Sequence, residues 1–179
     1  MNHLSKLLII LILFSLNSCS KDKKVISAIK EVNQQDEMIT AYNEGIQGIR
    51  DGDAFYAAKK FLEAELLYPQ SDWASKSVLM ASYSYYLQNY YFEAINNLER
   101  FIKTYPKDSR MAYAHYLLGM CYYENIESEK KDLEPLVIAK MQFNIVIDNY
   151  PGTDFALDSK FKIDLINDVL ASKETYVGR

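Results

Sequence analysis

Four side chains in this sequence carry the groups most often used for nucleophilic or metal chemistry: Cys19, Cys121, His3 and His115. A structural zinc site needs four such ligands, and a histidine-based triad needs a nucleophile and an acid beside the imidazole. The sequence contains no HExxH, no CxxC and no glycine-rich phosphate loop. Its carboxylates are spread along the chain and form no acid–base cluster. We therefore expect no enzyme activity, no catalytic residue, no metal and no cofactor.

Cys19 directly follows a short apolar segment at the start of the chain. Residues 7–16 read LLIILILFSL, a run that follows one positive charge at Lys6 and is too short to span a bilayer. Residues 16–19 read LNSC, which resembles the lipobox of bacterial lipoproteins, where the cysteine is lipidated and the signal is cut before it. We predict a signal peptide at 1–18 and lipidation of Cys19, which would hold the protein at a membrane. The alternative is an ordinary secretory signal with an incidental cysteine.

The residues after the cysteine bear on the location of the protein. In bacterial lipoproteins an aspartate directly after the cysteine favours retention in the inner membrane, so the resemblance leaves the outer membrane open for Ser20, with the periplasmic face as the expected side. Residues 20–36 are polar, contain three early lysines and have no long apolar face. We expect 19–37 to be a lipidated tether, helical near its end.

From residue 38 onward, one helical pattern occurs three times, and each copy ends in Tyr-Pro at Pro69, Pro106 or Pro151. A small residue, a large apolar residue and another apolar or small residue lie 12, 8 and 5 positions before each proline. These are Ala57, Phe61 and Ala64 in the first copy, Ala94, Leu98 and Phe101 in the second, and Ala139, Phe143 and Val146 in the third. Spacings of four and three place them on one helix face. The proline ends the helix because its ring fixes φ and it lacks an N–H.

An earlier helix in each copy has a small residue at the matching place, namely Gly45, Ser82 and Gly119. A unit of about 34 residues with a small residue at 8, Ala at 20, a large apolar residue at 24 and Pro at 32 resembles the tetratricopeptide repeat. We predict an all-α solenoid with repeats at 38–71, 75–108 and 112–153 and the first helix of an incomplete fourth repeat at 154–179. The third repeat contains a charged insertion at 124–135, which reads as a solvated loop or a docking loop. A helical bundle with chance similarity is the alternative fold.

Tyrosine is unusually frequent, with 15 copies in 179 residues. In tetratricopeptide repeats, first-helix positions 2, 5, 9 and 12 face a concave groove, which we expect to be lined by Tyr42, Tyr83, Tyr86, Tyr113, Tyr116 and Tyr123. Tyrosine combines apolar area with a hydroxyl at little entropic cost, which suits recognition of extended, aromatic-rich peptides. The alternative is that these tyrosines simply cover the core. His115 and Cys121 fall at packing positions, so we expect both to be core residues.

Charge excludes one further class of partner. The formal net charge is −4, and removal of residues 1–18, which contain one lysine and no acid, makes it −5. A mildly acidic chain without a basic run argues against binding to nucleic acid.

Several motifs narrow the resemblance to one family. They are YNEG at 42–45, YPQSDWA at 68–74, ASYSYY at 81–86, YAHYLLGMCYY at 113–123 and KFKID at 160–164. Together with the lipobox, they resemble the BamD (YfiO, ComL) lipoprotein family of the β-barrel assembly machinery. The resemblance implies a non-enzymatic protein on the periplasmic face of the outer membrane. Its implied partners are the barrel protein BamA, other lipoproteins of that machinery and unfolded outer-membrane proteins. The alternative function is another periplasmic repeat lipoprotein, a scaffold in envelope or cell-wall coordination.

The resemblance also implies about five repeats, whereas this sequence reaches Arg179 within a fourth, and the exposed end of a solenoid needs a polar cap. The last predicted helix is apolar at Phe161, Ile163, Leu165 and Ile166. We expect a fragment or truncated product. The alternative is a version that has lost the surface that docks BamA and the accessory lipoproteins.

Overall fold

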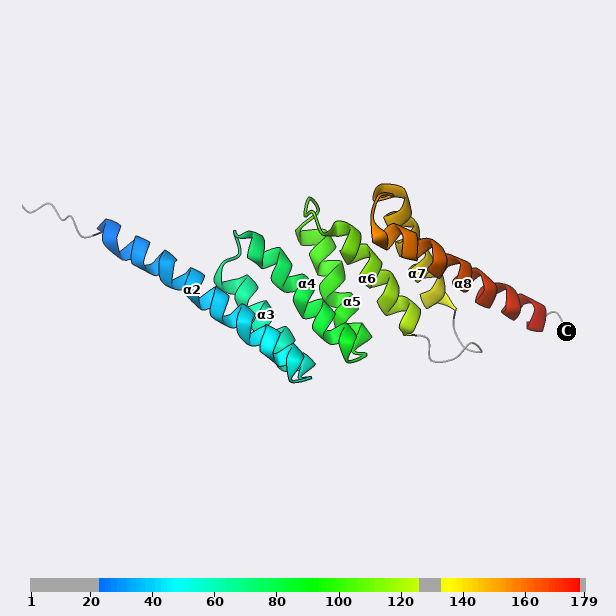
Figure 1. Cartoon of the computed structure of the whole chain (residues 1–179), viewed down its shortest axis with the longest axis horizontal. Helices are drawn as coiled ribbons and strands as arrows, with labels where there is room; N and C mark the ends of the chain where they lie inside the picture. The colour runs from blue at the N-terminus through cyan, green and yellow to red at the C-terminus, as the bar shows by residue number, and fades with distance from the viewer. Residues whose placement is uncertain (1–22, 126–132, 178–179) are drawn as a thin grey trace, which may run out of the picture. The chain divides into compact units, whose positions relative to one another are not determined.

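The computed structural model describes residues 23–125 and 133–177, with side-chain surroundings for 33–125 and 133–172. The predicted signal peptide, Cys19 and the centre of the predicted insertion lie outside the described residues. Within the described part there are seven helices and no strand. They are α2 (Lys23–Arg50), α3 (Ala54–Leu67), α4 (Asp72–Leu87), α5 (Tyr91–Thr104), α6 (Met111–Glu124), α7 (Glu134–Asn149) and α8 (Asp154–Val177) (Figure 1). The chain divides into two compact units, 1–36 and 37–179, and helices α3 to α8 belong to the second.

Helices in the second unit pack in the order of the chain. Each helix from α3 to α8 packs on the next one (Figure 1), and the end of α2 shares a core with α3. Contacts also join α4 to α6 and α6 to α8, so the first helices of successive pairs lie side by side. The prediction of an all-α tetratricopeptide-repeat fold is therefore confirmed, with three helix pairs followed by α8.

Helix α2 begins well before the predicted first repeat. The sequence predicts a tether up to residue 37 that is helical near its end, and α2 begins at Lys23. The physical reason is that residues 23–36 contain no glycine or proline to interrupt the helix that continues into repeat one.

The turns follow from local sequence. The second helices α3, α5 and α7 end one residue before the tyrosine of each Tyr-Pro pair. Between α2 and α3, Gly52 has a φ of 74°, and the Asp53 carboxylate accepts a hydrogen bond of 2.9 Å from the backbone N–H of Tyr56. Asn89 fills the matching turn with a φ of 62°, a conformation that asparagine tolerates better than most residues. Pro135 lies in the first turn of α7, as its position after the charged insertion predicts.

A complementary pair of side chains fixes how the two helices of each repeat approach. The large residue at position 24 is fully buried in every repeat, and its small counterpart at position 8 is Gly45 for Phe61, Ser82 for Leu98 and Gly119 for Phe143. A Cβ on Gly119 would lie 2.7 Å from the Phe143 ring, and one on Gly45 would lie 2.8 Å from the Phe61 ring. Serine is present only where the large residue is leucine. The phenylalanine rings therefore require glycine on the facing helix.

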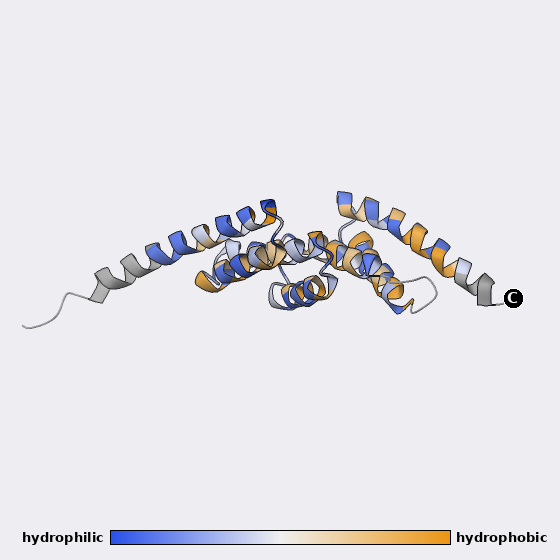
Figure 2. Ribbon diagram, turned by 90° about the horizontal axis from the view of Figure 1, so that it is seen from below, coloured by the Kyte–Doolittle hydropathy of each residue, from blue (hydrophilic) through white to orange (hydrophobic). Residues whose placement is uncertain are grey.

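Helix α8 exposes large apolar side chains on its outer face. Its inner face buries Ala156 and Ile166, but Leu157 is 72 % and Phe161 is 61 % exposed. Blue and orange segments alternate along α8 in Figure 2, in keeping with this mixture of polar and apolar residues. None of the helices in the described ranges combines the length and hydrophobicity needed to cross a bilayer.

Candidate functional site

Four of the six tyrosines expected to line a groove lie close together on α4 and α6. They are Tyr83, Tyr86, Tyr113 and Tyr116, which we call the tyrosine surface, and all four are partly exposed. The rings of Tyr113 and Tyr116 both contact Phe155 of α8, at centroid distances of 5.4 and 5.3 Å. These side chains thus pack against the core on one side and remain accessible on the other.

The hydroxyls of Tyr86 and Tyr113 stay protonated at neutral pH. Burial raises the pKa of Tyr86 to about 12, and the nearby Glu124 carboxylate adds to the increase. Burial also raises the pKa of Tyr113, with smaller effects from Tyr83 and Tyr86. A protonated phenol can donate a hydrogen bond to a backbone carbonyl while its ring covers an apolar side chain.

Tyr42 lies on α2, on a different helix from these four. Its ring is 7 % exposed and packs edge-on against Phe61 and Trp73, at centroid distances of 5.1 and 4.9 Å. The Lys76 ammonium lies over the rings of Tyr42 and Trp73, 5.1 Å from the Tyr42 centroid and 4.6 Å from the Trp73 centroid. We call Tyr42, Trp73 and Lys76 the Lys76 site. Trp73 is 37 % exposed, so an accessible aromatic face and a positive charge meet there.

The equivalent place two repeats later holds Tyr116, Phe155 and Asp158, which we call the Asp158 site. Its tyrosine occupies position 5 of a repeat, as Tyr42 does in the Lys76 site. Its second aromatic residue and its charged residue follow a Tyr-Pro proline by four and seven positions, as Trp73 and Lys76 do. The Tyr116 hydroxyl donates a hydrogen bond of 2.7 Å to Asp158 Oδ2. The two sites thus have a tyrosine, a second aromatic residue and a charged residue at equivalent places, and the charges are opposite.

Tyr123, the sixth expected residue, lies toward the end of α6. It packs against the core formed by α6, α7 and α8, and the Lys162 ammonium lies 4.9 Å from its ring centroid. Tyr123 thus packs on the same core as Tyr86 and Tyr116, whereas Tyr42 packs on the core formed by α2 and α3.

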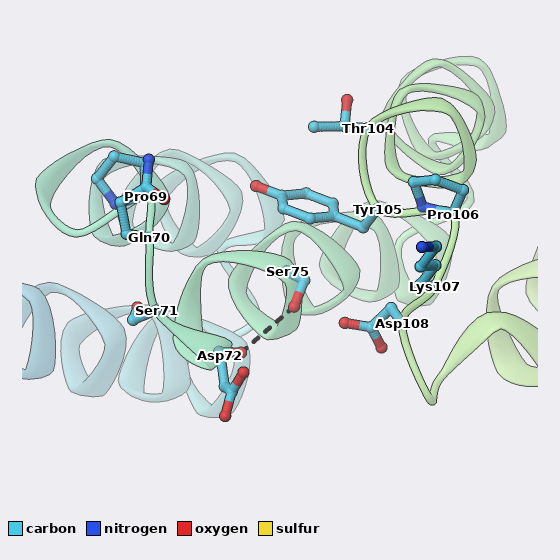
Figure 3. A pocket seen from close by; sticks show the side chains of 10 residues that line it. All are labelled: Pro69, Gln70, Ser71, Asp72, Ser75, Thr104, Tyr105, Pro106, Lys107 and Asp108. Carbon is cyan, nitrogen blue, oxygen red and sulfur yellow. Dashed lines mark hydrogen bonds between the residues drawn. The ribbon is translucent and has the colours of Figure 1, made fainter.

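A cleft of about 360 Å³ lies between the first two Tyr-Pro turns, and no pattern in the sequence indicated it. Its lining residues are Pro69, Gln70, Ser71, Asp72, Ser75, Thr104, Tyr105, Pro106, Lys107 and Asp108 (Figure 3). The Tyr105 ring lies across it with the hydroxyl directed toward the Pro69 turn (Figure 3). That hydroxyl donates a hydrogen bond of 2.8 Å to Glu65 Oε1, so the cleft adjoins a structural junction.

The junction is built on Glu65 of α3. Arg100 of α5 donates two parallel hydrogen bonds to its carboxylate, of 2.7 and 2.8 Å, and the Glu65 side chain is only 10 % exposed. This bidentate pair, completed by the Tyr105 hydroxyl, joins the second helices of repeats one and two.

A second ion pair closes the other side of the cleft. Arg110 donates to Asp108 Oδ2 at 2.7 Å and to the Ser75 hydroxyl at 2.7 Å, and its backbone N–H also donates to Asp108. The hydrogen bonds from Arg110 lower the pKa of Asp108 to about 2, from an ordinary value of 3.8.

This lowered pKa gives a pH prediction. A depressed folded-state pKa stabilises the fold above the unfolded-state pKa, and this contribution is lost as the pH falls from about 4 to about 2. Asp108→Asn should therefore be less stable than the original chain at neutral pH, and the difference should shrink over that acid range. Urea unfolding at several pH values measures it, and a difference that stays constant down to pH ~2 would contradict the assignment.

The two remaining reactive side chains take structural roles. The His115 Nδ1 lies 2.8 Å from Gln142 Oε1, in a hydrogen bond that joins α6 to α7. Cys121 is fully buried, and burial raises the pKa of its thiol to about 12, which leaves the inert thiol that the sequence predicts. His115 is half-buried, so it lies at a helix contact as expected but keeps one edge exposed.

Sequence reasoning missed part of the site. Asp158 was not among the expected residues, although its signal was available because it occupies the same repeat position as Lys76. Trp73 and Phe155 were not among the expected site residues either. With them included, an accessible aromatic region extends from α4 to α8, with an ammonium on one side and a carboxylate on the other. Such a surface can bind an extended polypeptide by stacking and hydrogen bonding without chemical change.

Comparison with known proteins identifies relatives of this chain. Residues 34–179 match the model of the YfiO family, described as outer membrane lipoprotein. The chain is 38 % identical over 138 residues to the outer membrane protein assembly factor BamD of Caulobacter vibrioides, covering 77 % of this chain and 45 % of that protein. It is 37 % identical over 140 residues to the BamD of Rickettsia prowazekii, covering 78 % of this chain and 56 % of that protein. The chain thus spans about half the length of these curated relatives.

Proposed function

Because this chain belongs to the YfiO family of outer membrane lipoproteins, we propose that it is a non-enzymatic assembly factor whose tyrosine surface binds unfolded outer-membrane proteins. The proposal rests on one observation: Tyr83, Tyr86, Tyr113 and Tyr116 form a partly exposed aromatic cluster across two repeats. An unfolded outer-membrane strand alternates apolar and polar residues. Aromatic faces would cover the former, while phenolic hydroxyls would bond the backbone.

The wider setting is part of the same proposal. Lipidation of Cys19 would anchor the protein to the outer membrane on its periplasmic face, and the helices would lie in the aqueous space beside it. The partners would be a BamA-type barrel protein and other lipoproteins of the assembly machinery. The names of the relatives as assembly factors support this setting.

Replacement of a tyrosine in the cluster should weaken peptide binding. Tyr83→Ala is expected to raise the Kd for an unfolded, tyrosine- and phenylalanine-rich outer-membrane peptide about 10-fold, because truncation of an aromatic anchor commonly costs more than 1 kcal/mol of binding free energy. Fluorescence anisotropy with a labelled peptide and the purified chain measures the Kd.

Tyr56→Ala provides the matched control. Tyr56 lies on α3, outside the tyrosine surface, and is 42 % exposed, so its removal deletes an equally large side chain without touching the proposed site. Equal losses of affinity in the two variants would argue that the cluster only covers the core. No measurable binding of the peptide by the original chain would reject the proposed function.

A further inference from the structure

The Lys76 site and the Asp158 site have charges that the described part of the chain leaves without an opposite partner. In the described residues the ion pairs are Lys60 with Glu44 and Glu63, Arg100 with Glu65, and Arg110 with Asp108. Neither Lys76 nor Asp158 belongs to any of them. Lys76 instead lies over two aromatic rings, and Asp158 accepts a hydrogen bond from a phenol.

The neighbours of Lys76 leave its positive charge available. The nearby Arg110 guanidinium is held by Asp108 and Ser75. The rings of Tyr42 and Trp73 orient the Lys76 ammonium without neutralising it, because a cation–π contact transfers no formal charge. The ammonium is therefore placed beside the accessible face of Trp73.

The same reasoning applies with the sign reversed at the other site. The Tyr116 hydroxyl fixes Asp158 Oδ2 at 2.7 Å, and the Phe155 ring stands beside the same tyrosine. A neutral phenol leaves the carboxylate with its full negative charge and with further acceptor positions. One aromatic pair thus has a cation next to it, and its counterpart two repeats later has an anion.

From this arrangement we infer that the tyrosine surface binds an extended polypeptide in one orientation, with an acidic group at the Lys76 site and a basic group at the Asp158 site. The inference rests on the proposed function and adds the charge pattern of its ligand. The tyrosine surface shares α4 with Lys76, and its Tyr116 also belongs to the Asp158 site. Neighbouring helices pack roughly 8–10 Å apart, so first helices two repeats apart are on the order of 20 Å apart. An extended chain covers that distance with about six residues.

Photo-crosslinking tests the orientation directly. The peptide has a glutamate at one end, a lysine at the other, about six tyrosine, phenylalanine and threonine residues between them, and blocked termini. One version has the photoreactive group beside the glutamate and the other beside the lysine. With the full chain in detergent, the glutamate-side probe should label residues around Lys76 and the lysine-side probe residues around Asp158, as read by mass spectrometry.

A double charge swap supplies the decisive comparison. Lys76→Glu with Asp158→Lys keeps the net charge and should exchange the two labelling patterns. Each single replacement should abolish the preference and raise the Kd about 3- to 10-fold, as expected for the loss of partly exposed charge pairs. The singles also keep the test valid if the double variant does not fold. As a control, Lys103→Glu with Asp148→Lys makes the same exchange on α5 and α7 and should leave both patterns unchanged.

A second arm tests whether a free terminal carboxylate can take the place of the glutamate side chain. A peptide whose only acidic group is a free terminal carboxylate should label the Lys76 region like the glutamate peptide, since the ammonium recognises either carboxylate. Equal labelling of both regions by either probe would overturn the orientation and leave the proposed function standing. Absence of binding by every peptide would overturn both.

Discussion

Gly119→Ser is expected to lower the free energy of unfolding by about 2–3 kcal/mol, because an added side chain has no room against the facing helix. The new Cβ would meet the Phe143 ring at 2.7 Å, and Phe143 is fully buried. Serine forms helix slightly better than glycine, by about 0.5 kcal/mol, which offsets only a small part of the overpacking. Urea unfolding followed by circular dichroism measures the loss.

Repeat two shows how the loss should be relieved. Ser82 is fully buried at the equivalent position, where its hydroxyl donates to the Val78 carbonyl at 2.9 Å, and the large residue of that repeat is Leu98. Phe143→Leu should cost about 1–2 kcal/mol alone but should recover stability in the Gly119→Ser background. Gly152→Ser is the control, since a Cβ there meets nothing within 4 Å. Strictly additive losses in the double variant would contradict the complementary pair.

The helix pattern could be predicted because its determinants are local. Tyr-Pro ends a helix wherever it occurs, and an apolar residue every three or four positions selects the buried face. The same periodicity identified the buried residues at position 24, Phe61, Leu98 and Phe143. The start of α2 was harder to predict, because a polar segment without breakers is compatible with either a tether or a helix. The segment is helical because it continues directly into the part of α2 that is buried from Met38 onward.

The tyrosines show where local pattern stops being informative. Tyr42 and Tyr116 occupy the same repeat position, yet Tyr42 is buried and Tyr116 is half-exposed. Tyr42 lies between Phe61 and the larger Trp73, whereas Tyr116 has Phe155 in place of the tryptophan. Exposure therefore depends on the neighbouring repeat, which sequence position within one repeat does not specify.

Long-range ion pairs were the least predictable feature. Glu65 and Arg100 are 35 residues apart, and neither belongs to a helix-spaced charge pair that would indicate the contact. A glutamate in the middle of an amphipathic helix is expected on the solvated side, but Glu65 is 7 % exposed. Only the stacking of α3 against the following repeat explains why a charged residue is buried there.

The pair nonetheless has a measurable consequence. Arg100→Met is expected to lower the free energy of unfolding by about 2–3 kcal/mol, because it leaves the Glu65 carboxylate buried without its cation. The value lies at or below the low end of the 3–5 kcal/mol range for fully buried pairs, since Arg100 is 42 % exposed and partly solvated. Tyr105 still donates one hydrogen bond, which reduces the loss but does not neutralise the charge.

Removal of both charges distinguishes a buried pair from lost packing. Glu65→Met with Arg100→Met should be more stable than Arg100→Met alone, because two apolar side chains of similar length leave no unpaired charge at the junction. Lys60→Met removes the pairs of Lys60 with Glu44 and Glu63 and should have a much smaller effect, because those two carboxylates are 42 % and 45 % exposed and stay solvated. If the double variant were as unstable as the sum of the two single variants, the hydrocarbon stem of Arg100 and not its charge would hold α3 and α5 together.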